Sequence, residues 1–193
     1  MNYQELIKIG KPLFGCEDLA KVFGQTLPSA RVAASRYVKN GLLTRLKKNT
    51  YVLSGALGKA SRNEIFSIAS RLQVPSYISF QSALEFYELS TQVQPAFVEC
   101  VLLKRTVSYS AGGFVFNYSR IGRSLYFGFR RENNFFIAEP EKALLDCLYF
   151  TAMGRYSFDP GSVYFDKFDR KKFKKMALAF PEKTRRLADK WIP

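Results

Sequence analysis

A helix, a short turn and a second helix between residues 17 and 41 restrict this chain to a small set of folds. The first helix is expected over residues 17–23, with two acids in its first turn and a glycine directly after it. The turn leads to Pro28, which suits the start of a helix that extends to Lys39 and stops at Asn-Gly. With a short helix expected over residues 2–10, this is the element order of helix-turn-helix proteins.

The helix that ends at Lys39 has two different faces. At about 100° per residue, one arc is rich in alanine, which allows close packing against neighbouring helices. The opposite arc carries arginine, lysine and serine, which bond phosphates and guanine edges. The side chains predicted to contact duplex DNA here are Ser29, Arg31, Val32, Ser35, Arg36 and Lys39. Val32 has two interpretations, contact with a thymine methyl group or a position at the edge of the core.

Two short alternating segments, residues 42–46 and 50–53, predict a β-hairpin after this helix. Asn49 lies in the turn between them, and asparagine tolerates the left-handed conformation that a hairpin turn needs. Helices and hairpin together predict a winged helix-turn-helix DNA-binding domain over residues 1–55. The expected contacts with phosphates or the adjacent minor groove are Arg45, Lys47 and Lys48. For any one of these side chains, an ordinary solvated turn position is the alternative.

The remaining residues, 56–193, have the pattern of an α+β domain. Helices are expected over residues 62–72 and 80–87, the second with Ser79 as its N-cap. Strands rich in aromatic residues and valine follow and predict a meandering, mostly antiparallel sheet. These strands are expected over residues 97–103, 106–109, 114–118, 125–129 and 135–137. The fold class expected for the chain is α+β, with an N-terminal winged helix-turn-helix and a C-terminal α+β domain.

The charge of the chain predicts a polyanionic partner. There are 30 Lys+Arg against 16 Asp+Glu and no histidine, a formal net charge of +14. Nucleic acid or an acidic membrane surface would satisfy such an excess. Residues 167–190 hold ten of the cations, nine of them in two expected basic helices over residues 169–179 and 183–191. A second basic surface is predicted there at Lys171, Lys172, Lys174, Lys175, Arg185 and Arg186. This surface is a site for nucleic acid or an anionic partner, or alternatively a solvated helix face.

Other function classes have little support in the sequence. The three cysteines are scattered, which favours a reducing cytosol and speaks against structural zinc. No apolar run approaches the roughly 20 residues of a membrane span, and no signal peptide precedes the first helix, so we expect a cytoplasmic protein without a membrane partner. Without histidine, the common Ser-His-Asp and Cys-His catalytic sites are excluded, and there is no phosphate loop of the P-loop type.

One cluster, residues 139–142 (Glu-Pro-Glu-Lys), is superficially similar to the carboxylate-and-lysine sites of metal-dependent nucleases. Those sites normally project from strands, whereas this cluster opens a helix at Pro140. Charge at the positive end of the helix dipole accounts for both glutamates. We therefore expect no catalytic activity, no cofactor, no bound metal and no small-molecule substrate.

Four landmarks are spread over nearly the whole chain. The first is the third helix, followed by a basic wing that ends at residues 50–53, and the second is the segment 76–87 (SYISFQSALEFY). The third consists of residues 126–129 (YFGF) together with residues 137–146 (IAEPEKALLD). The fourth is Phe180-Pro181 with the basic residues after it. Together they resemble the AbiEi-type antitoxins, the DNA-binding halves of type IV toxin–antitoxin and phage-defence modules. One departure is Asn49, because that family commonly has glycine in the wing turn.

The resemblance implies an antitoxin that also represses its own promoter, at an inverted repeat in duplex DNA. It further implies that the second domain counters a nucleotidyltransferase-like toxin, either directly or indirectly. The basic residues 167–190 could contact that toxin, its RNA substrate or flanking DNA. The alternative is a stand-alone winged-helix transcriptional regulator without a toxin partner.

Overall fold

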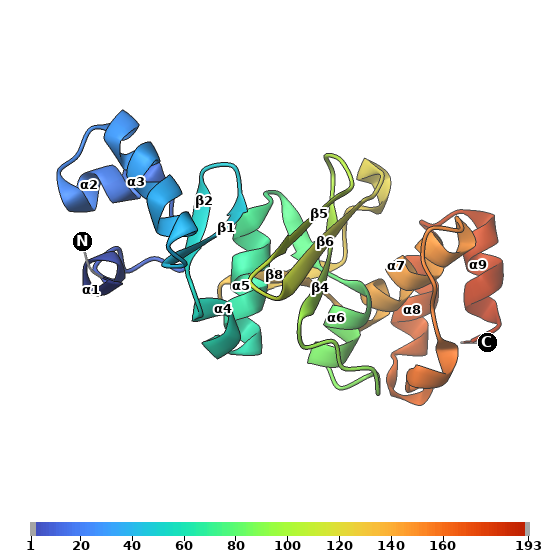
Figure 1. The fold of residues 1–193 in the computed structure, drawn as a ribbon. Helices are drawn as coiled ribbons and strands as arrows, with labels where there is room; N and C mark the ends of the chain where they lie inside the picture. The colour runs from blue at the N-terminus through green and yellow to red at the C-terminus, as the bar shows by residue number, and fades with distance from the viewer. Residues whose placement is uncertain (1–2, 192–193) are drawn as a thin grey trace.

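Three helices and a hairpin occupy one end of the molecule in the computed structural model, which describes residues 3–191 (Figure 1). Thr26 caps the third helix by accepting a hydrogen bond from the backbone of Ser29, so this helix begins one residue before Pro28. The elements are α1 (Tyr3–Ile7), α2 (Cys16–Phe23), α3 (Leu27–Lys39), β1 (Leu43–Lys47) and β2 (Thr50–Leu53). Residue 2, in the first predicted helix, lies outside the described residues.

The alanine-rich arc of α3 faces inward, as predicted. Ala30 and Ala34 are fully buried, and Tyr37 lies beside them against α2. Leu6 of α1 and Leu19 of α2 complete the centre of this small N-terminal core. Because alanine has only a methyl side chain, α2 and α3 approach each other closely, and the opposite arc of α3 is directed to solvent.

The hairpin β1–β2 contributes side chains to two cores. Leu43 and Tyr51 pack with the three helices. Leu46 and Val52 pack instead into the larger core formed by the rest of the chain. The predicted domain boundary falls at Gly55, which adopts a left-handed conformation before α4 (Ala56–Lys59), but packing is continuous across it.

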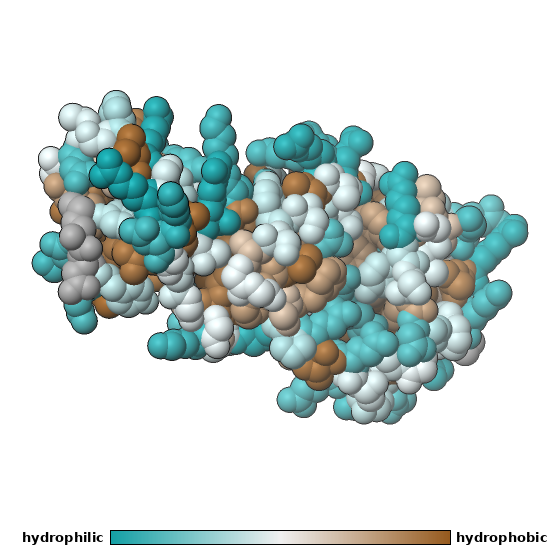
Figure 2. All heavy atoms as spheres, in the orientation of Figure 1, coloured by the Kyte–Doolittle hydropathy of each residue, from teal (hydrophilic) through white to brown (hydrophobic). Residues whose placement is uncertain are grey.

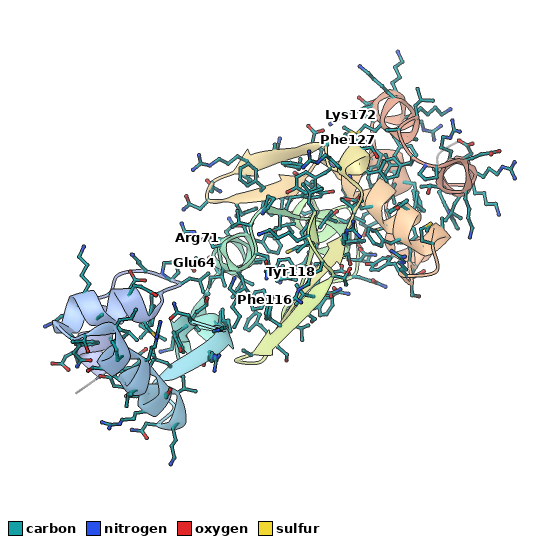
Figure 3. All side chains as sticks on the ribbon, turned by 90° about the horizontal axis from the view of Figure 1, so that it is seen from above. Glu64, Arg71, Phe116, Tyr118, Phe127 and Lys172 are labelled. Atoms are coloured by element: carbon teal, nitrogen blue, oxygen red, sulfur yellow. The ribbon has the colours of Figure 1, made fainter. Side chains whose placement is uncertain are left out.

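Helices and a six-stranded sheet form the second part of the chain. The helices are α5 (Arg62–Leu72), α6 (Phe80–Phe86), α7 (Pro140–Ala152), α8 (Arg170–Ala177) and α9 (Glu182–Asp189). The strands are β3 (Ser76–Ile78), β4 (Phe97–Leu102), β5 (Val107–Ala111), β6 (Phe114–Arg120), β7 (Phe129–Glu132) and β8 (Phe135–Ala138). The sheet lies between α5 on one side and α7 on the other, and α8 and α9 end the molecule opposite α1–α3 (Figures 1 and 3). The expected α+β class is confirmed.

The expectation of a mostly antiparallel sheet is wrong, because the sheet is mixed. Its strand order is β5-β6-β4-β3-β8-β7, and the pairs β4–β6 and β3–β8 are parallel. The chain leaves β4, crosses to β5 at the edge, and returns through a tight turn at Gly112-Gly113 to place β6 beside β4. Alternation of side chains predicts that a segment is a strand, but it does not select its neighbour.

The predicted strand over residues 125–129 is also wrong. Leu125 ends a 3₁₀ turn (Arg123–Leu125), and β7 begins only at Phe129. Gly128 separates the two with a φ of 69°, a left-handed conformation that a strand cannot continue through. Within residues 3–191, no helix combines the length and the apolar composition that crossing a bilayer requires.

Candidate nucleic-acid interface

The outer face of α3 displays all of its predicted DNA contacts. Ser29, Arg31, Ser35, Arg36 and Lys39 are each exposed. Among residues 3–191, none of the three cations forms a salt bridge with an acid. Hydrophilic side chains gather over α3 and the neighbouring hairpin in Figure 2. The face therefore offers positive charge and hydrogen-bond donors to an anionic partner.

Val32 lies in the middle of this polar face. Its side chain is 52% exposed, which is incompatible with a position at the edge of the core. Burial elsewhere on α3 is confined to the opposite arc. The exposure leaves Val32 available to a partner, and its contact with a thymine methyl group stays a prediction.

The two lysines of the hairpin, Lys47 and Lys48, lie in different environments. Lys48 and Arg45 are exposed, as predicted. The side chain of Lys47 is instead half-buried, and its ammonium donates a hydrogen bond to the carbonyl of Leu72 at the end of α5. Burial, assisted by the charge of nearby Lys104, lowers the pKa of Lys47. The prediction that Lys47 contacts phosphate is therefore not supported by its position.

A β-bulge explains this change in direction. The register of β1 against β2 shifts between Arg45 and Lys47, which places an extra residue on β1. A bulge turns the following side chain away from the alternation of the strand, so Lys47 points toward the second core rather than toward solvent. The sequence carries no glycine or other signal that marks this bulge.

Asn49 joins the hairpin turn to the start of α2. Its φ of 54° confirms the predicted left-handed conformation. The side-chain carbonyl accepts a hydrogen bond from the backbone of Cys16 at 2.8 Å, and the amide donates to the Glu17 carboxylate at 2.9 Å. This hydrogen bond from Asn49 is the main reason that the pKa of Glu17 lies below its usual value. Glycine could provide the turn but not these contacts, so asparagine here also fixes the hairpin relative to α2.

The second basic surface, on α8 and α9, is partly neutralised. Lys171, Lys174, Lys175 and Arg185 are exposed. Lys172, labelled in Figure 3, bridges Glu139 and Glu141 at the start of α7, at 3.5 Å and 2.9 Å. Arg186 pairs with Glu182 one turn earlier in α9. Two of the six predicted side chains therefore have acidic partners, because folding brings the start of α7 against α8 and Glu182 lies one turn from Arg186.

Residues 139–142 do not form an open carboxylate-and-lysine site. Glu141 is buried, and besides Lys172 it accepts a hydrogen bond from the backbone of Asp169 at 3.3 Å. The helix dipole therefore accounts for only part of its role, since Glu141 also attaches α8 to α7. Among the described residues, no group of histidine, cysteine or acidic side chains has the arrangement of a metal site.

Lys142 and Asp146 form a fully buried ion pair one turn apart on α7. The Lys142 ammonium also donates to the Tyr77 hydroxyl at 2.9 Å. Asp146 accepts hydrogen bonds from Tyr77 at 3.0 Å and from Ser79 at 2.7 Å. Ser79 does occupy the N-cap position of α6, but its hydroxyl donates to this carboxylate instead of capping the helix.

Three aromatic rings enclose the Lys142 ammonium, at 5.3–5.6 Å from the ring centroids. They belong to Tyr77, Phe127 and Phe180, and Figure 3 labels Phe127 at this junction. Each ring comes from a different one of the last three sequence landmarks. Those landmarks thus meet in a buried cluster that connects β3, α7 and the segment after α8, a structural role that their spacing alone did not indicate.

Comparison with known proteins adds a likeness of fold. No family model matches the chain, and no curated protein does. Among solved structures, the crystal structure of the RV2827C protein from Mycobacterium tuberculosis is similar, with a TM-score of 0.66. The match covers 98% of this chain and 74% of that protein at 12% sequence identity, so what the two proteins share is the fold.

Proposed function

We propose that this protein binds duplex DNA through α3 and the hairpin, used as a winged helix-turn-helix. The observation that carries the proposal is the outer face of α3, where Arg31, Arg36 and Lys39 are exposed and Ala30 and Ala34 are buried opposite them. A helix of this kind fits the major groove with its polar face toward the base edges.

The exposed side chains divide into two roles in this proposal. Arg31 and Arg36, about 1.4 turns apart on α3, read guanine edges, and Val32 between them contacts a thymine methyl group. Arg45 and Lys48 of the hairpin contact phosphates and set the register of the protein on the duplex. Lys47 has no part in binding, because its ammonium is bonded to Leu72.

We further propose that the protein is an antitoxin and an autorepressor of a type IV toxin–antitoxin or phage-defence module. The resemblance of its landmarks to the AbiEi-type antitoxins supports this function. In this role the protein acts in the cytoplasm and by binding rather than by catalysis. The partners would be an inverted repeat in its own promoter and, directly or indirectly, a nucleotidyltransferase-like toxin.

The DNA-binding proposal is tested with duplex DNA taken from directly upstream of the gene and with a shuffled duplex of equal composition. Arg31→Ala and Arg36→Ala should each reduce discrimination between the two duplexes by about 5- to 150-fold, since a bidentate contact discriminates by about 1–3 kcal/mol. The matched control for the double variant Arg31→Ala/Arg36→Ala is Lys171→Ala/Lys175→Ala, which also removes two positive charges, but from α8. If the double variant Arg31→Ala/Arg36→Ala retains full affinity and discrimination, α3 is not the reading element.

The antitoxin proposal is tested by co-expression with the neighbouring reading frame. Full-length protein should restore growth if that frame encodes a nucleotidyltransferase-like toxin. Failure to restore growth, with the protein present and folded, would contradict the proposal. Repression of the promoter without any toxin nearby would instead support the alternative, a stand-alone regulator. Footprinting on the upstream region should show two protected half-sites.

A further inference from the structure

A second group of exposed cations lies at one end of the six-stranded sheet. Residues 100–131 contain six arginine or lysine residues and no acid. All six are exposed, and four of them follow or end neighbouring strands and form no salt bridge within the described part of the chain. This sheet-end cluster consists of Lys104, Arg105, Arg120 and Arg123.

Strand topology brings the four side chains together. Because β4 and β6 are parallel, with Leu102 opposite Arg120, both strands end at the same edge of the sheet. Lys104 and Arg105 follow β4, whereas Arg123 follows β6. The hydroxyl of Thr106 accepts a hydrogen bond from the backbone of Arg120 at 3.1 Å, which holds the β4–β5 turn against the end of β6.

The cluster is continuous with the hairpin. Lys104 lies close enough to Lys47 for its charge to assist burial in lowering the pKa of that lysine. Strand β1 lies beside β5, and Thr44 lies near the β5–β6 turn at Gly112. The β1–β2 turn and the β4–β5 turn rise on the same side of the molecule in Figure 1, and Figure 2 shows hydrophilic side chains along this edge.

We propose that the DNA-binding surface continues from the hairpin onto the sheet-end cluster, where Lys104, Arg105, Arg120 and Arg123 contact phosphates of the same duplex. This inference rests on the proposed function of α3 and the hairpin. It identifies the second domain as part of the DNA-binding surface, one that adds affinity without reading sequence, since phosphates are the same at every base pair.

The experiment measures dissociation constants over a range of salt concentrations with two duplexes from the upstream region. One has about 12 base pairs, just over one helical turn, and the other about 30, close to three turns. Wild-type full-length protein is compared with two variants that each lose four charges. The first is Lys104→Gln/Arg105→Gln/Arg120→Gln/Arg123→Gln. The matched control is Lys59→Gln/Arg71→Gln/Arg131→Gln/Arg155→Gln, which removes four exposed cations that belong to none of the basic surfaces described above.

On the longer duplex, the sheet-end variant should bind at least tenfold more weakly than wild type. The slope of log affinity against log salt should decrease by about 2–3.5, because each lost phosphate contact removes about 0.9. Its affinity for the shorter duplex and the behaviour of the control variant should change far less. A wild-type slope in the sheet-end variant, or equal losses in both variants, would show that the inference is wrong.

The same measurements separate the two proposals. If wild-type protein does not bind the longer duplex, or if Arg31→Ala/Arg36→Ala binds like wild type, the proposed function fails. If binding depends on Arg31 and Arg36 but not on the sheet-end cluster, only the extension of the surface is wrong.

Discussion

Replacing Asp146 with asparagine should destabilise the protein by about 3–5 kcal/mol, the usual cost of removing one member of a buried ion pair. The substitution keeps the shape of the side chain and an oxygen that can accept from Tyr77 and Ser79. It leaves the Lys142 ammonium, which has no exposed surface, without its counter-charge. The aromatic rings around Lys142 offset part of this loss, since a desolvated cation–π contact contributes up to about 2 kcal/mol.

The double variant Lys142→Met/Asp146→Asn distinguishes the cost of the unpaired Lys142 charge from the cost of changing the side chain at position 146. Methionine is close to lysine in length and carries no charge, so neither member of the pair remains ionised. We expect this variant to be at least about 2 kcal/mol more stable than Asp146→Asn alone, because an unpaired buried charge is the main cost. The measurement is urea unfolding at neutral pH, followed by circular dichroism, for wild type, both single variants and the double variant.

Two results would refute this reasoning. If Asp146→Asn costs less than about 1 kcal/mol, the ion pair is not desolvated as its burial implies. If the double variant is no more stable than Asp146→Asn, the loss comes from the altered hydrogen bonds of Tyr77 and Ser79 and not from the charge of Lys142.

Three further predictions concern single residues. Burial raises the pKa of Glu99 from 4.5 to about 7, so the stability it contributes is complete below about pH 4.5 and is lost as pH rises through 7. Glu99→Gln should therefore flatten the decline in urea stability between pH 5 and pH 8, by up to about 3 kcal/mol. Gly128→Ala should cost about 1–3 kcal/mol in the same assay, because φ is 69° and the new methyl group would lie 3.2 Å from Lys142 side-chain carbons. Lys48→Met should weaken binding to every duplex and reduce the salt slope by about 1, whereas Lys47→Met should leave the slope unchanged.

The sequence predicted best those features that depend on local periodicity. Helix α3 was expected from Pro28 to Lys39 and extends over Leu27–Lys39, with its faces divided as predicted. The helix starts one residue earlier than expected because the Thr26 hydroxyl accepts a hydrogen bond from the Ser29 backbone and so caps it before Leu27. Helical faces are predictable because 3.6 residues per turn determine which side chains share a side.

Features that depend on distant contacts could not be predicted in this way. The mixed sheet arises from which strands become neighbours, and nothing in the alternation of β4 or β6 encodes that choice. The sequence does not distinguish Lys47 from an exposed turn lysine, because only the bulge in β1 directs its ammonium to the carbonyl of Leu72. Helix α8 contains no acid, and Asp169 before it caps the backbone, yet Glu139 and Glu141 of α7 reach the Lys172 ammonium. The sheet-end cluster likewise required the register of β4 against β6.

Because the hairpin packs into both cores, we expect the two parts of the chain to unfold together. A fragment ending at residue 55 would transfer Leu46 and Val52 from a core into water, at a cost of about 1.5–3 kcal/mol for each side chain. That loss is large beside the roughly 5–15 kcal/mol that stabilises a typical domain. Loss of DNA binding by a fragment truncated at the boundary suggested by the sequence would therefore reflect unfolding of the fragment and not the loss of a DNA contact. The same shared hairpin gives the end of the sheet a fixed orientation relative to α3.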